Sequence, residues 1–160
     1  MFRIYHFAFL ILLFLTTTFA VQAQQDWDYE WEHHHISFTL AEDFKTVTNT
    51  ADEYTAKGDG MEFGIFPFAD ETIDATDIIA YTTAVGKSLK LEQLDDTDVL
   101  ELNGLKGAYV EGYKEGDRII LVGFIDPLSA TNFFALITFG DNDAVAEDEA
   151  VRMLKSIRKK

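Results

Sequence analysis

Two segments of the chain are apolar at nearly every position, and they constrain the fold more than any other feature. They are IILVGFI at residues 119–125 and FFALITF at residues 133–139. Successive side chains of a β-strand point to opposite faces of the sheet, so a strand that is apolar throughout must be covered on both faces. We therefore expect Ile120 and Leu136 to lie in the core, with a further layer on each side of their sheet.

Two segments have the spacing of amphipathic helices that could form those layers. The first is predicted from about Ala75 to Lys90 with Asp74 as its N-cap, and the second from about Ala144 to Ile157 with Asp143 as its N-cap. Acids at the start of the second helix and bases at its end complement the helix dipole. The expected buried stripes are Ile78, Thr82, Val85 and Leu89 in the first helix, and Ala146, Ala150, Met153, Leu154 and Ile157 in the second.

Strands are predicted over most of the rest of the chain, with tight turns between them. Glycine-containing turns are expected at residues 58–60, 103–104 and 115–117. Alternation also places Ile36, Phe38 and Leu40 on one face of an early strand. Together with the two helices, these strands predict an α+β fold, a three-layer α/β/α sandwich with a mainly antiparallel sheet and two main helices. The predicted strands span residues 35–40, 53–68 (as a hairpin), 98–103, 105–114, 117–126 and 131–140.

The first 23 residues have the features of a secretory signal peptide. A short basic region with Arg3 precedes an apolar stretch from Phe7 to Leu15, and small residues at Val21 and Ala23 suit cleavage before Gln24. An uncleaved membrane anchor is the alternative, because the segment from Ile4 to Ala20 is nearly long enough to span a bilayer. The chain has no cysteine, which excludes a lipidated cysteine, disulfides and thiol catalysis. Export to the periplasm or the outside of the cell is predicted.

Charge narrows the possible partners. Without Arg3, the single base of the signal segment, the chain from Gln24 onward has 28 acidic and 12 basic residues, a net charge of −16. Such a surface repels phosphate backbones and anionic lipid headgroups, so we expect neither nucleic acid nor peripheral binding to an anionic membrane. A protein partner and a divalent cation remain compatible with this charge.

The predicted mature chain opens with the acidic and aromatic segment DWDYEWEHHH, residues 26–35. As one extended strand it would place Trp27, Tyr29 and Trp31 on the same face. One interpretation is an edge strand whose aromatic rings cover the sheet. The other is an exposed aromatic stripe that binds a partner.

His33 and His35 would share that face, with His34 turned away. Two such rings could converge on one zinc ion or another divalent cation, with any third ligand supplied by a neighbouring strand. No other cofactor is predicted. This pair is a weak candidate for a metal site.

The order of the predicted elements resembles that of the PsbP-like superfamily, which includes an extrinsic photosystem subunit, a Ran-binding nuclear import factor and bacterial envelope proteins. The resemblance covers residues 36–157 and rests on ISFTLAEDF, GLKGAYVEGYKEGDRIILVGFI and AVRMLKSI. One departure is Ala41, which stands where the family often has proline. The predicted organisation is thus a signal peptide (1–23), an acidic-aromatic segment (24–33) and a globular domain (34–160) that resembles the PsbP-like superfamily. The resemblance implies an adaptor that binds other proteins.

Catalytic motifs are missing from the sequence. None of the serines lies in a nucleophile-elbow motif, and there is no phosphate-binding loop, dinucleotide fingerprint or zinc-protease motif. We therefore expect a non-enzymatic binding module that recognises a protein. Two alternatives stay open: a hydrolase of envelope polymers that uses paired carboxylates, and a small-molecule carrier. A carrier needs a sizeable apolar pocket, whereas the phenylalanines are expected to fill a solid core, namely Phe63, Phe66, Phe68, Phe124, Phe133 and Phe134.

The predicted signal peptide gives the first testable expectation. The protein recovered from the producing cell should begin at Gln24, because Val21 and Ala23 occupy the small-residue positions that a signal peptidase requires. Intact-mass measurement checks this directly. A mass that retains Met1 would contradict cleavage and favour the membrane anchor.

Overall fold

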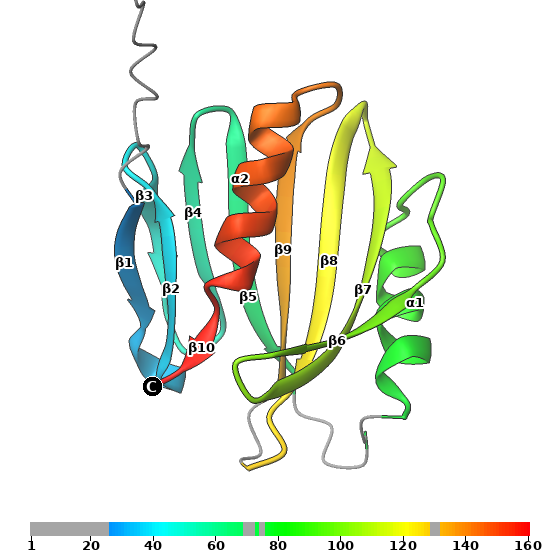
Figure 1. Cartoon of the computed structure of the whole chain (residues 1–160), viewed down its shortest axis with the longest axis horizontal. Coiled ribbons are helices and arrows are strands. Elements are labelled where there is room, and N and C mark those ends of the chain that lie inside the picture. Colours follow the sequence, from blue (N-terminus) through cyan, green and yellow to red (C-terminus); the bar gives the residue numbers. More distant parts are fainter. Residues whose placement is uncertain (1–25, 69–72, 74–75, 129–131) are drawn as a thin grey trace, which may run out of the picture.

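The computed structural model describes residues 26–68, 73, 76–128 and 132–160, and Figure 1 shows how its elements are arranged. Most of the secondary structure is β-strand, with two α-helices and one short 3-10 helix (η1). In chain order the elements are β1 (Asp26–Trp31), η1 (Glu32–His34), β2 (Ile36–Ala41), β3 (Lys45–Asn49), β4 (Tyr54–Gly58), β5 (Met61–Phe68), α1 (Ile78–Ser88), β6 (Asp98–Leu102), β7 (Leu105–Lys114), β8 (Asp117–Ile125), β9 (Asn132–Gly140), α2 (Ala144–Lys155) and β10 (Arg158–Lys159).

The strands form two antiparallel sheets. The larger one has the order β3-β4-β5-β9-β8-β7-β6, and the smaller one has the order β1-β2-β10. The sequence predicted the central strands of the large sheet, whereas β3, β10 and the separate small sheet were missed. The three predicted turns are confirmed, and both turn residues have positive φ in each of them: Asp59-Gly60, Asn103-Gly104 and Glu115-Gly116.

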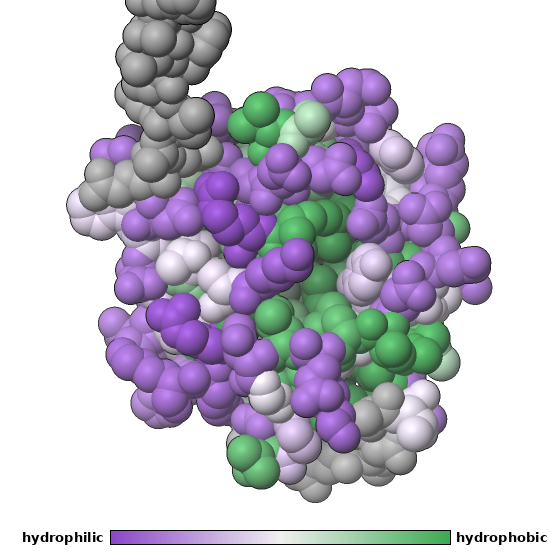
Figure 2. Space-filling view, viewed as in Figure 1, coloured by the Kyte–Doolittle hydropathy of each residue, from purple (hydrophilic) through white to green (hydrophobic). Residues whose placement is uncertain are grey.

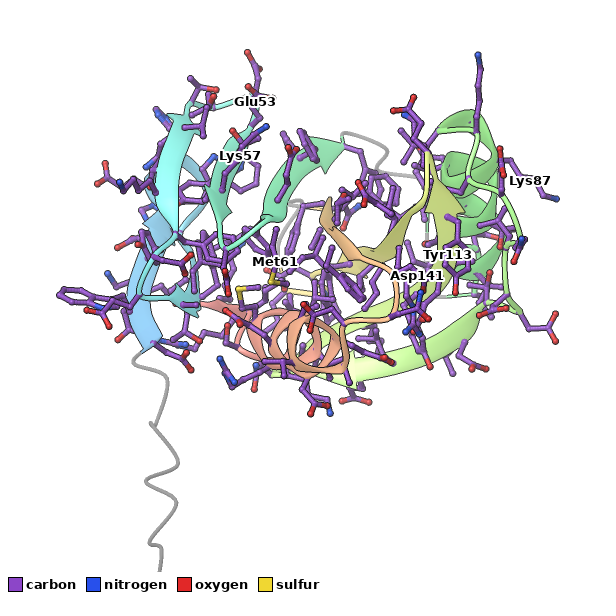
Figure 3. All side chains as sticks on the ribbon, turned by 90° about the horizontal axis from the view of Figure 1, so that it is seen from above. Glu53, Lys57, Met61, Lys87, Tyr113 and Asp141 are labelled. Atoms are coloured by element: carbon purple, nitrogen blue, oxygen red, sulfur yellow. The ribbon has the colours of Figure 1, made fainter. Side chains whose placement is uncertain are left out.

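The two helices lie on opposite faces of the large sheet (Figures 1 and 3). Helix α1 packs on β7 and β8, and α2 packs on β9 and on β2 of the small sheet. The predicted three-layer sandwich is therefore confirmed, with the small sheet sharing the layer of α2. Among the described residues, no helix is long and apolar enough to span a membrane.

Burial on both faces is confirmed for β8 and for most of β9. Ile120, Val122 and Phe124 are buried on the α2 side, and Leu121 is buried in the cluster that packs under α1. The prediction that Leu136 lies in the core is wrong. Its side chain is only partly buried, at the margin of that cluster. The reason is that α1 covers β7 and β8 rather than β9.

The phenylalanines predicted to fill the core mostly do so. Phe63, Phe124, Phe133 and Phe134 are buried. Phe66 and Phe68 are partly exposed. Those two lie toward the end of β5.

The predicted helix faces agree with the structure. The proposed start of the first helix, Asp74 and Ala75, lies outside the described residues, and α1 begins at Ile78. Its buried side is that of Ile78 and Thr82, with Val85 and Leu89 packed beside them. In α2 the Asp143 carboxylate accepts hydrogen bonds from the amides of Val145 (3.1 Å) and Ala146 (3.0 Å), which confirms the N-cap. Helix α2 ends at Lys155, and all five residues of its predicted apolar stripe are buried.

The two-face burial predicts a graded response to truncation. Leu121→Ala should lower the free energy of unfolding by about 2–5 kcal/mol, because it opens a cavity between the sheet and α1. Leu136→Ala is the matched control on the neighbouring strand, and its loss should be smaller since part of that side chain faces solvent. Denaturant titration measures both. Equal losses would contradict the placement of α1 over β7 and β8.

A second prediction concerns Tyr54, which is buried with its hydroxyl 2.7 Å from Thr46 Oγ1. Burial raises the pKa of Tyr54 to about 12, although the hydrogen bond to Thr46 lowers it in part. The unfolded chain therefore releases this proton first, and stability should fall as the pH rises from about 10 through 12. In Tyr54→Phe, the decrease in the free energy of unfolding between neutral and alkaline pH should be smaller by roughly 1–3 kcal/mol. Denaturant midpoints at about pH 9 and pH 11.5 test this, and an unchanged alkaline loss in the variant would contradict it.

Candidate functional site

The acidic-aromatic segment is not the continuous strand that the sequence predicted. Strand β1 ends at Trp31, η1 follows, and His35 takes a left-handed conformation with φ 53° that lets the chain reverse into β2. The strands then pair antiparallel, with Trp31 opposite Ile36 and Tyr29 opposite Phe38. Directly opposed residues share a face of the sheet. The aromatic residues of β1 and the apolar residues of β2 therefore point the same way.

This reversal buries most of the proposed aromatic stripe. Trp31 has no exposed surface, and its indole donates a hydrogen bond to the Thr50 carbonyl at 2.6 Å. Tyr29 is half-buried and donates to the Phe44 carbonyl at 2.9 Å. Only Trp27 keeps a large free surface, with 50% of it exposed. Trp31 therefore presents no surface to a partner and Tyr29 only part of its side chain, whereas Trp27 stays a predicted contact.

The acidic residues of β1 are matched by basic residues from the C-terminal end of the chain. Asp26 lies 3.0 Å from Arg152, and Asp28 lies 3.4 Å from Arg158. Glu30 pairs with Lys160 at 2.5 Å. Exposed pairs of this kind each contribute little to stability, about 0.2–1 kcal/mol. They do compensate the charge of β1, so this face is not an open acidic surface.

The histidines do not have the geometry from which a metal site was argued. His33 lies in η1 and His35 in the turn that follows, so the expectation of a shared strand face is wrong. His34 packs against Trp31, with ring centroids 4.0 Å apart, and its Nε2 lies 2.7 Å from the Ala51 carbonyl oxygen. Among the described residues no three histidine or carboxylate side chains are grouped to hold a metal. Metal binding by His33 and His35 stays an untested prediction, now without the strand geometry.

An open groove with a largely apolar lining lies on the α2 side of the large sheet. The small sheet and α2 cover the middle of that face and the end with β3, whereas the end with β6, β7 and β8 has no covering helix (Figure 1). Figure 2 shows apolar surface gathered there, beside α2. The groove has a volume of about 340 Å³. Its lining consists of Leu100, Glu101 and Leu102 from β6, Tyr109 and Glu111 from β7, Ile120, Val122 and Phe124 from β8, and Val151, Leu154 and Lys155 from α2.

Each part of the groove follows from the local sequence. Alternation along β8 turns Ile120, Val122 and Phe124 toward this face, and they form a buried apolar floor. The turn between β6 and β7 is held to the end of α2, where the Asn103 amide donates to the carbonyls of Lys155 (3.2 Å) and Ile157 (2.7 Å). That contact fixes the distance between the two walls of the groove.

Charged and polar groups lie at the margin of the groove. Partial burial raises the pKa of the Tyr109 hydroxyl, and the nearby Asp98 and Glu111 carboxylates raise it further. Glu111 forms an ion pair with Arg118 at 2.5 Å, and Arg118 also pairs with Glu147 at 2.7 Å. The hydrogen bond from Arg118 to Glu111 raises the pKa of the guanidinium. The raised pKa values keep the Tyr109 hydroxyl neutral and the Arg118 guanidinium charged near neutral pH. The apolar groove therefore has polar and charged groups at its margin.

Sequence reasoning missed the groove because its walls come from four separate elements. The available signal was Val151, an apolar residue of α2 outside the predicted buried stripe. It is half-buried and packs at the groove. A second signal was Leu100 and Leu102, which give a short edge strand an apolar face.

No protein-family model matches the sequence, and no curated protein matches it either. Solved structures do match in three dimensions. A protein from Bacteroides thetaiotaomicron has a TM-score of 0.53 at 12% identity over 86% of this chain, which spans only 48% of that protein.

Two further structures match over most of both chains. The Ran-binding protein Mog1p of Saccharomyces cerevisiae has a TM-score of 0.55 at 7% identity, over 84% of this chain and 95% of its own. LpqN of Mycobacterium tuberculosis, described as involved in cell envelope biogenesis, has a TM-score of 0.54 at 12% identity, over 85% of this chain and 91% of its own. At such identities the likeness concerns the fold alone. The expectation raised by the sequence is confirmed at that level: the chain has the fold of the PsbP-like superfamily.

Proposed function

We propose that this chain is an exported, non-enzymatic binding module that recognises another protein through the groove between α2 and β6. The observation that carries the proposal is a groove between α2 and β6 whose buried floor on β8 is bordered by partly exposed apolar side chains, among them Leu100, Tyr109 and Val151. Contiguous apolar surface rimmed by polar groups is typical of protein interaction sites. The acidic margin of the groove and the net charge favour a partner that carries basic residues.

The structural neighbours support a binding role and a place in the envelope. Mog1p is a Ran-binding protein, and LpqN is involved in cell envelope biogenesis. Both share this fold, so the fold is compatible with recognition of a protein and with an envelope protein. The predicted signal peptide supports export independently of these neighbours.

One observation favours a second candidate, a carrier of a small apolar molecule. The groove volume of about 340 Å³ lies in the range of ligand pockets, and its lining is largely aliphatic. Organic extraction of the purified protein followed by mass spectrometry distinguishes the two. A stoichiometric apolar compound would favour the carrier, and its absence would favour the protein-binding module.

A pair of valines on α2 tests the groove directly. Val151 borders the groove, whereas Val145 on the same helix is 69% exposed and is not among the residues that line it. Val151→Glu would place a charge against the apolar lining and should reduce capture of the native partner from an envelope extract at least about tenfold, equal to roughly 1.4 kcal/mol. Val145→Glu should leave capture unchanged, since it adds the same charge to the same helix.

Two controls complete this experiment. Thermal melts of both variants establish that each is folded before binding is compared. Trp27→Ala tests the remaining exposed member of the aromatic stripe. If Val151→Glu still captures the partner and Trp27→Ala does not, the groove is rejected as the binding site and β1 is supported.

A further inference from the structure

Strand β6 is an edge strand whose free side is open to a further strand. Within the described part of the chain it pairs only with β7, and its position at the end of the sheet leaves its other side without a strand. Asn103 and Gly104 form a two-residue turn with φ of 51° and 82°, so the flanking pair Leu102–Leu105 exchanges both of its backbone hydrogen bonds. Bonded and non-bonded pairs alternate along an antiparallel ladder. The amides and carbonyls of Val99 and Glu101 therefore point away from β7.

Those outward groups have no backbone partner within the described part of the chain. Such an edge is a template for another strand, and natural proteins usually cover it or blunt it. Val99 is also 66% exposed, which is unusual for a large apolar residue on an unprotected edge. The backbone of β6 thus offers two donors and two acceptors at the surface.

The free edge of β6 borders the groove. Leu100 and Leu102 face the core, and Glu101 alternates to the opposite face of the strand, yet all three line the groove. This is expected when a strand lies edge-on to a cavity. Figures 1 and 3 show that the end of the sheet with β6 curls into the layer of α2. A strand added to β6 would consequently lie over the groove floor beside α2.

The groove has a charge polarity along β6. Asp95, Asp96 and Asp98 are exposed at the start of the strand and make no ion pair in the part of the chain that the structure describes. Lys155 lies beside the other end, where the turn after β6 bonds to its carbonyl. A second copy of this chain, with its strongly negative charge, would meet repulsion at such an edge. A partner segment with basic residues is favoured instead.

We propose that the partner binds as an extended segment that adds antiparallel to β6, with alternate apolar side chains in the groove. This inference rests on the proposed function and specifies its binding mode. Antiparallel addition places the C-terminal end of the segment beside Asp98 and its N-terminal end beside Lys155. The segment therefore carries a basic residue after its apolar positions and an acidic residue before them. Main-chain hydrogen bonds to Val99 and Glu101 supply affinity, and the groove selects the side chains.

Selection of random phage-displayed peptides on the chain from Gln24 onward, which contains every described element, tests the binding mode. Selected peptides should alternate apolar residues and end in lysine or arginine. Glu101→Pro removes one outward amide without removing a β6–β7 bond, a position that an edge strand tolerates. It should weaken the selected peptides about tenfold. Glu101→Gln removes the same charge but keeps the amide, so it is the reference against which the loss of about tenfold in Glu101→Pro is measured.

A second measurement does not depend on the proline variant being folded. The amides of Val99 and Glu101 should exchange with deuterium at least about tenfold more slowly once the parent is saturated with a selected peptide. Unchanged exchange at both amides would overturn strand addition. If Val151→Glu nevertheless abolished binding of that peptide, the result would support recognition through the groove and reject only the addition of a strand to β6. Peptides insensitive to Val151→Glu and to Glu101→Pro alike would overturn both.

Discussion

Burial of apolar side chains on both faces of β8 is the constraint on which the rest of the structure depends. Leu121 requires cover on one side of the sheet, and Ile120 and Phe124 require it on the other. Helix α1 meets the first demand over β7 and β8. On the second face the chain provides α2 and the small sheet, and these extend from β3 to β9. The groove lies over β7 and β8, between α2 and the curled strand β6. Its floor on β8 is buried, and Leu100, Leu102 and Val151 are partly exposed at its walls.

Contacts with the C-terminal residues explain why most of the conspicuous N-terminal segment is not open surface. Strand β10 joins the small sheet beside β2, which brings Arg158 and Lys160 next to the acids of β1. The hairpin of β1 and β2 buries Trp31 in the core beside the large sheet. Most of the acidic residues and aromatic rings that suggest a binding surface in the linear sequence are thus paired or buried within the domain. The groove, in contrast, keeps apolar surface and open backbone edges.

Local patterns predicted most of the fold. Periodicity identified the buried side of each helix, Asp143 marked a cap that the structure contains, and Asn103-Gly104 marked a turn. The errors arose where tertiary contacts decide the outcome. Alternation continues through Trp31 to His35 in the sequence, and nothing local signals that His35 takes positive φ and reverses the chain. The candidate site was unpredictable for a related reason, since Leu100 and Val151 become neighbours only when β6 curls toward α2.

We infer that the groove beside α2, rather than β1, contacts the partner. Carbene footprinting of the protein in buffer and in its native envelope measures this without knowledge of the partner. Recognition through the groove predicts lower labelling of Leu100, Tyr109 and Val151 in the envelope, with Val145 on the same helix unchanged. Undiminished labelling of those groove residues together with protection of Trp27 would contradict it.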